Sequence, residues 1–199
     1  MKKLLFLSSS VFLLTIAQAQ VKLGIKGGVN ISSITGNTYG STSTLAGVNA
    51  GILASFPLFG HFSLQPELVY SAQGAETSDL TVAATLNTTY YNIPVLFKYT
   101  HPTGIFVETG PQMGFLTKAN LKFDNYTENE KPNYRSADYA WAFGCGYQLK
   151  AIDLGIDARY NMGLTNFFEE NYDGQAKNNV FQIGLYYLFG FKSSPAPTP

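Results

Sequence analysis

The chain has 199 residues, of which 13% are charged and 15% aromatic, and its formal net charge is zero. A balanced charge gives no sign of a nucleic-acid partner, and the single Cys145 excludes an intrachain disulfide framework and a cysteine-rich metal site. Beyond the N-terminal region, no apolar run reaches the length of a transmembrane helix.

The N-terminus has the pattern of a secretory signal peptide. Two lysines are followed by the mostly apolar stretch 4–16 and by the small-x-small sequence at 17–19. This pattern predicts cleavage near Ala19, and an N-terminal anchor helix is the less favoured alternative. Removal of 19 of the 199 residues leaves 180, the size of one domain. We therefore predict a signal peptide over 1–19, a barrel domain over 20–192 and a short Pro-rich tail over 193–199.

From residue 21 onward, apolar and polar residues alternate with the period of two that is typical of β-strands. In 21–31 the odd positions are aliphatic, apart from one glycine, and the even positions are lysine, glycine or asparagine. In 181–191 the odd positions are aromatic or aliphatic. Segments of this kind recur along the chain and predict eight strands at about 21–32, 46–56, 62–73, 88–100, 105–117, 137–149, 152–164 and 179–191.

One face of each predicted strand is small and polar, and the other is apolar and aromatic. A soluble lipocalin-like barrel would hide the apolar face inside. The apolar residues alternate with Lys26 and Glu67, so the two sets cannot both lie inside. If the polar face is interior, the apolar face meets lipid. The predicted fold is therefore all-β, a transmembrane eight-stranded antiparallel up-and-down β-barrel.

Short and long connections alternate strictly between the predicted strands, as in outer-membrane barrels with short periplasmic turns and long extracellular loops. An even number of strands then places both termini in the periplasm, and the outer membrane is the expected location. The short connections are 57–61, 101–104 and 150–151, and the long ones are 33–45, 74–87, 118–136 and 165–178.

Aromatic residues on the apolar face cluster near the strand ends, where they would form the two interfacial girdles of a membrane barrel. Near the short turns these are Phe56, Phe62, Tyr99, Tyr147, Phe189 and Phe191. Near the long loops they are Tyr70, Tyr91, Phe115, Tyr139, Trp141 and Phe181.

The same phase directs four basic and four acidic side chains into the barrel, among many amides. An eight-stranded barrel is only wide enough for its side chains to fill, so a balanced network that plugs the interior is favoured over a narrow gated ion path. The predicted interior charges are Lys22, Lys26, Glu67, Lys98, Glu108, Asp153, Asp157 and Arg159.

Three prolines, Pro66, Pro94 and Pro111, interrupt the predicted strands, where prolines often mark bulges. Two of the strings around them, LQPELVY at 64–70 and IPVLFKY at 93–99, stand in register with the strands, as do GIKGGVN at 24–30 and GPQMGFL at 110–116. Together these four strings resemble the PorT-type outer-membrane β-barrel family of Bacteroidetes over about 21–191. The resemblance implies the fold and the location, and it implies a link to protein secretion for the family's founding member. It supplies no catalytic residue.

No catalytic, cofactor or metal site is expected. The two histidines, His61 and His101, fall in short turns, across the membrane from the loop acids that a Ser–His–Asp constellation would need. The acidic loop residues have no spacing of a known Ca²⁺ motif. They are Asp124, Glu128, Glu130, Glu169, Glu170 and Asp173.

The sequence thus predicts a small, non-enzymatic outer-membrane barrel with a structural or interaction role. The alternative is a narrow gated pore or an accessory barrel of a secretion system. The expected partners are the lipid bilayer, periplasmic chaperones and the barrel-assembly machinery, with secretion-system proteins as a further possibility and nucleic acid excluded.

Overall fold

The computed structural model describes residues 21–36, 42–79, 82–123, 127–129, 131–166 and 176–190. The predicted signal peptide, most of the last long loop and the Pro-rich tail lie outside these residues. The strands are β1 (Lys22–Gly36), β2 (Thr42–Pro57), β3 (Phe62–Asp79), β4 (Val82–Thr100), β5 (Ile105–Lys122), β6 (Thr127–Asn129), β7 (Ala137–Leu149), β8 (Leu154–Gly163) and β9 (Ala176–Phe189), with one 3₁₀ turn, η1 (Lys131–Asn133).

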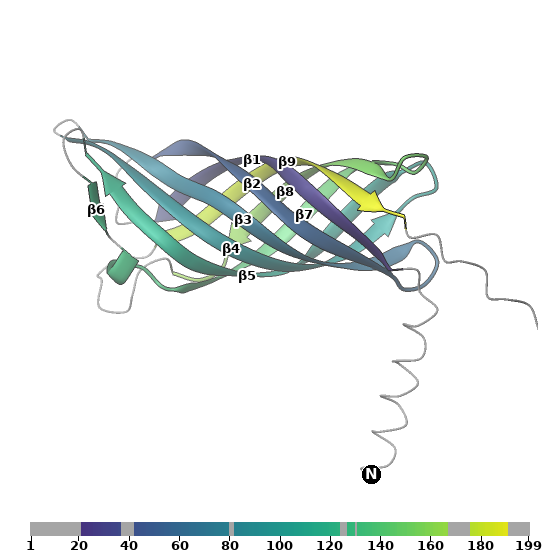
Figure 1. Ribbon diagram of the computed structural model, residues 1–199. Coiled ribbons are helices and arrows are strands. Elements are labelled where there is room, and N and C mark those ends of the chain that lie inside the picture. The colour runs from purple at the N-terminus through teal and green to yellow at the C-terminus, as the bar shows by residue number, and fades with distance from the viewer. Residues whose placement is uncertain are drawn as a thin grey trace, which may run out of the picture.

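Eight long antiparallel strands close into a barrel (Figure 1). Each pairs with its neighbour in the chain, and β1 pairs with β9 to close the ring, with Gly28 opposite Gly184. The short strand β6 pairs with the outer end of β5 and takes no part in the closure. The predicted eight-stranded up-and-down barrel is confirmed. Among the described residues, no helix is both long enough and apolar enough to cross a membrane.

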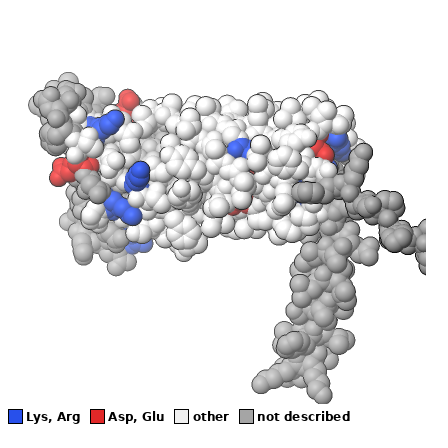
Figure 2. Space-filling view, viewed as in Figure 1, with Lys and Arg blue, Asp and Glu red and all other residues white. Residues whose placement is uncertain are grey.

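The strand phase places polar groups inside and apolar groups outside over most of the barrel. In β9, every even position from 176 to 188 is buried, and every odd position from 181 to 189 is exposed. On the side of the barrel seen in Figure 2, most charged side chains lie near the two ends, with a nearly uncharged band between them. Such an apolar outer band is the surface that a lipid environment requires.

Aromatic side chains flank this band. Phe62 stacks on Phe97, with ring centroids 5.1 Å apart, and contacts Tyr99 at 5.1 Å near the short turns. Near the other end, Tyr70 and Tyr91 meet edge to face at 5.9 Å. Both sets lie where the two predicted girdles were expected.

Three of the long loops, 33–45, 74–87 and 118–136, are shorter than predicted because the strands beside them are longer. β2 begins at Thr42, β3 continues to Asp79, β4 begins at Val82 and β5 continues to Lys122, so much of 33–45, 74–87 and 118–136 is strand. The last strand likewise begins at 176 rather than 179, whereas β8 begins at 154 rather than 152.

The physical reason is that the polarity of the two faces inverts beyond the apolar band. On β5, Lys118 and Lys122 are exposed, whereas Ala119 between them is completely buried. Inside this end of the barrel lies an apolar cluster rather than a polar one. Its buried members are Ile34, Ala75, Leu86, Tyr90, Leu116, Ala119, Tyr134 and Ala176. A prediction that requires apolar residues on the outer face therefore ends these strands too early.

The three prolines do not shift the strand register. Pro66 lies opposite Val95, Pro94 opposite Gln112, and the ladders continue in the same register beyond them. The register shifts occur elsewhere, between Thr44 and Asn49 on β2 and between Thr89 and Tyr90 on β4. A proline removes one backbone donor, which the ladder tolerates here without an inserted residue.

Candidate functional site

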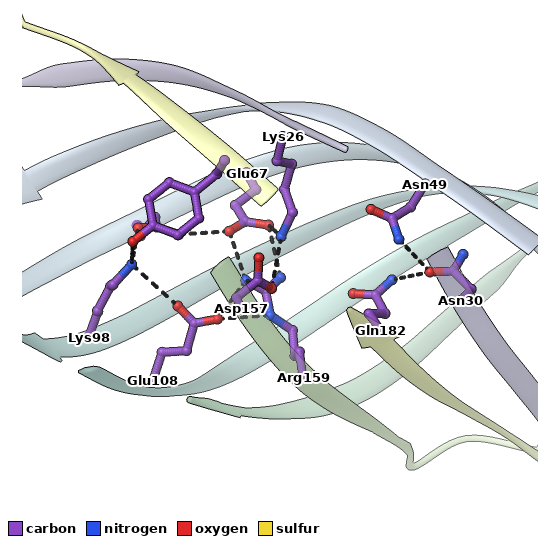
Figure 3. Close-up of polar contacts among 11 residues, drawn as sticks. Lys26, Asn30, Asn49, Glu67, Lys98, Glu108, Asp157, Arg159 and Gln182 are labelled. Carbon is purple, nitrogen blue, oxygen red and sulfur yellow. Dashed lines mark hydrogen bonds and ion pairs between the residues drawn. The ribbon is translucent and has the colours of Figure 1, made fainter. Parts of the chain in front are cut away.

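Six of the eight predicted interior charges meet at one level inside the barrel (Figure 3). They come from five strands, β1, β3, β4, β5 and β8, because the inward phase of each strand brings one or two of them to the lumen. All are buried, and the most exposed of them keeps only 8% of its surface accessible. We call Lys26, Glu67, Lys98, Glu108, Asp157 and Arg159 the interior charge cluster.

Arg159 is the centre of this cluster. Its Nη1 and Nη2 donate to the two carboxylate oxygens of Glu67, each at 2.9 Å. Its Nε and Nη2 donate to Glu108 Oε1 at 3.0 and 2.6 Å. A planar guanidinium can serve two carboxylates in this way, and the bidentate geometry fixes the distance between the strands that carry them.

Two lysines complete the charge balance. Lys26 Nζ lies 3.2 Å from Glu67 Oε2 and 3.6 Å from Asp157 Oδ2. Lys98 Nζ lies 3.9 Å from Glu108 Oε2. With Arg159, three positive charges face three negative ones, so no net charge is buried at this level. Balance matters because an unpaired charge in a desolvated interior is strongly destabilising.

Lys98 is also held by aromatic groups. Its Nζ donates to Tyr186 Oη at 3.0 Å and to Gln65 Oε1 at 3.3 Å. It lies 3.6 Å from the ring centroid of Phe106 and 4.4 Å from that of Tyr186, which are cation–π distances. Sequence reasoning missed Phe106 and Tyr186. Their even positions in the strands already indicate that they point inward, but the prediction considered aromatic residues only on the outer face.

The remaining two predicted interior charges lie apart from the cluster. Lys22 Nζ donates to Asp153 Oδ1 at 2.7 Å, and both side chains are partly exposed. They stand at the barrel mouth on the side of the short turns, because Lys22 begins β1 and Asp153 precedes β8. Asp153 has a φ of 53°, in the left-handed region that non-glycine residues rarely adopt.

A second, uncharged network fills the lumen toward the long loops. Asn30 Oδ1 accepts from Asn49 Nδ2 at 2.7 Å and from Gln182 Nε2 at 3.0 Å (Figure 3). Asn30 Nδ2 donates to Ser71 Oγ at 2.9 Å. Asn178 donates from Nδ2 to Gln73 Oε1 at 2.6 Å, so the network reaches one residue beyond the predicted start of the last strand at 179.

Glycines make room for the large interior side chains. A Cβ on Gly155 would lie 2.2 Å from Tyr186 Cζ and 2.5 Å from its Oη, so the tyrosine that supports Lys98 occupies the space of the missing side chain. We expect Gly155→Ala to lower the free energy of unfolding by about 1–3 kcal/mol through overpacking. Gly27→Ala is the matched control, because its Cβ would have its nearest neighbour, Asn49 O, at 3.8 Å. Urea titrations of both folded variants test this; equal losses would contradict it.

The two histidines lie in the short turns, outside the interior charge cluster. His61 and His101 are exposed in the short turns, at the opposite end from Glu128. Among the described residues, no three His, Cys, Asp or Glu side chains are grouped to hold a metal ion. The other loop acids named above lie outside the described part of the chain.

Comparison with known proteins agrees with this architecture. Residues 16–169 match the family described as outer membrane protein beta-barrel domain. No curated protein sequence matches the chain. Among solved structures, the fold is similar to that of Neisserial surface protein A, with 8% identity, a TM-score of 0.55, and coverage of 84% of this chain and 97% of that one.

It is also similar to the fold of Ail, the attachment invasion locus protein of Yersinia pestis, crystallised alone and with the heparin analogue sucrose octasulfate. In the complex the identity is 17% and the TM-score 0.50, over 85% of this chain and 99% of that one. At such low identity the likeness concerns the fold alone. The family match covers most of the chain, and the structure is a closed barrel with a polar interior and an apolar outer band. The protein therefore belongs to the outer membrane protein β-barrel domain family.

Proposed function

We propose that this protein is a plugged outer-membrane barrel whose long-loop end serves a structural or interaction role, without catalysis and without a cofactor. The observation that carries the proposal is the position of Arg159, 1% exposed and bound to carboxylates of both β3 and β5 across the lumen. Side chains that fill the cross-section leave no space for an aqueous channel, as the small width of an eight-stranded barrel leads one to expect.

We further infer that the short turns and both termini face the periplasm. In support, β1 begins and β9 ends at the short-turn end, while the extended hairpins and β6 lie at the other (Figure 1). In this orientation the signal peptide is removed near Ala19, and periplasmic chaperones and the barrel-assembly machinery deliver the chain to the membrane. The exposed Lys118, Lys122 and Lys177 then lie on the extracellular side, where a partner can reach them.

Planar-bilayer recordings test the plug. We expect the purified protein to give no large, stable unit conductance, because the interior charge cluster closes the lumen. Steady openings comparable to those of a trimeric porin would refute the proposal. Rare small openings whose frequency changes with Glu108→Gln, and not with the exposed Lys177→Gln, would instead indicate a narrow gated path through the cluster.

The second candidate is an accessory barrel of a protein-secretion system. It is favoured by the four strings that resemble PorT-type barrels, all of which lie in the barrel wall. Affinity capture from crosslinked outer membranes distinguishes the two roles. Co-purification of secretion-system proteins in stoichiometric amounts would support the accessory role, whereas recovery of the barrel with lipid alone would support a stand-alone protein.

A further inference from the structure

A polar pocket of about 290 Å³ opens at the short-turn end of the barrel. It lies between the turns that follow β2, β4 and β7 and the first residue of β1. Its wall is rich in lysine, hydroxyl and amide groups. The residues that line it are Lys22, Ser55, Pro57, Gly60, His61, Phe62, Ser63, Gln65, Lys98, Thr100, Gln148, Lys150, Asp153 and Leu188.

The pocket is closed at its inner end. Lys98 and Gln65 form part of its lining, and both are only 2% exposed. The Lys98 ammonium packs against the rings of Phe106 and Tyr186 and links the pocket floor to the rest of the interior charge cluster through Glu108. A solute that enters from this end therefore reaches a floor rather than a passage, which is the geometry of a binding site.

Counted over the part of the chain that the structure describes, the charges around the pocket leave one cation in excess. The lip and the interior charge cluster together hold five cationic and four acidic side chains. Lys22 is paired with Asp153, and the three cations of the cluster balance its three carboxylates. The unmatched charge belongs to Lys150, whose Nζ donates to the backbone carbonyls of His101 and Pro102 at 3.1 and 3.2 Å and makes no ion pair with a carboxylate of the described residues.

Donors also remain for a ligand at the lip. An ammonium group has three N–H donors. Lys150 uses two of them on the carbonyls, and Lys22 uses one on Asp153. The hydroxyl groups of Ser55, Ser63 and Thr100 add further donors to the wall.

We propose that this pocket binds a small soluble anion carrying one carboxylate or phosphate group, held by Lys22 and Lys150 at the lip. Asp153 is the competing anion, because its carboxylate occupies Lys22. The proposal goes beyond the role proposed above, which concerns the opposite end of the barrel. It stands or falls separately from the conductance result, since a lip site can bind whether or not the lumen opens.

The test is a titration of the protein, purified from outer membranes into a neutral detergent, with inorganic phosphate and with acetate. Amide NMR shifts of Gly60, Ser63 and Gln148 report binding. We expect saturable shifts at these residues, and Asp153→Asn should tighten binding about fivefold, which corresponds to about 1 kcal/mol. Asparagine tolerates the positive φ at this position, so the variant should keep the fold.

Lys150→Gln should weaken binding about fivefold, and Lys177→Gln, which removes an exposed lysine at the other end, should leave it unchanged. Unchanged or weaker binding in Asp153→Asn would overturn the proposal, as would shifts that spread evenly over both ends. A response to nanodiscs containing phosphatidylglycerol, with none to free phosphate or acetate, would assign the pocket to a lipid headgroup and overturn the soluble ligand.

Discussion

Replacement of Arg159 by methionine is expected to lower the free energy of unfolding by about 3–5 kcal/mol, the typical cost of removing one partner from a buried charge network. Glu67 would lose both of its guanidinium hydrogen bonds, and Glu108 would lose the two that its Oε1 accepts. Both carboxylates would stay buried among fewer cations. The measurement is a urea titration of the barrel folded into lipid vesicles.

A compensated variant separates the charge effect from the loss of packing. When Glu67→Gln is added to Arg159→Met, most of the lost stability should return, because two lysines then face two carboxylates: Lys26 keeps Asp157 at 3.6 Å and Lys98 keeps Glu108 at 3.9 Å. The control is Lys177→Met, an exposed lysine on β9 that makes no ion pair among the described residues, and it should change stability by less than about 0.5 kcal/mol. If the double variant Arg159→Met/Glu67→Gln is less stable than Arg159→Met alone, the cluster is not held by its charge balance.

The second large effect is expected at Leu185, on the outer face of β9. This side chain is 55% exposed and lies in register between Ile156 of β8 and Gly27 of β1. It stands midway between the flanking aromatics Phe181 and Phe189, so Leu185→Arg places a charge near the centre of the apolar band. We expect a loss of about 2–4 kcal/mol in the vesicle titration.

The adjacent residue supplies the matched comparison. Gly184 faces the lumen, where a Cβ would lie 3.2 Å from Gly27 O and 3.3 Å from Asp157 Oδ1. That Asp157 oxygen has no hydrogen-bond partner in the described part of the chain, so the hydroxyl of Gly184→Ser could donate to it. The serine variant should lose less than about 1 kcal/mol. Similar losses at 184 and 185 would mean that the two residues do not face opposite sides of the wall.

The strand ends show where sequence reasoning stopped. The outward apolar residues that predict the strands end near Phe115 on β5 and begin near Tyr91 on β4. Beyond that point Lys118 and Lys122 face outward and Ala119 inward. Leu116 and Ala119 are both buried although they are three residues apart, because a register shift against β4 leaves one extra residue, Thr117, between them. The polar–apolar alternation of the sequence therefore runs on, while the extra residue turns its polar positions from the lumen to the outside.

The sequence by itself determined which face of each strand points inward and how many strands form the barrel, because alternation is a local property of each strand. It thereby determined the inward direction of Lys26, Glu67, Lys98, Glu108, Asp157 and Arg159. Only the tertiary structure decided which of these side chains meet. Arg159 and Glu67 stand 92 residues apart on β8 and β3, which are not neighbours in the wall, and they touch across the lumen. The positions of the strands along the barrel also leave Lys22 and Asp153 at the mouth, where both line the polar pocket. Pairing across a closed barrel depends on the register of every strand between the partners, and no single strand carries that information.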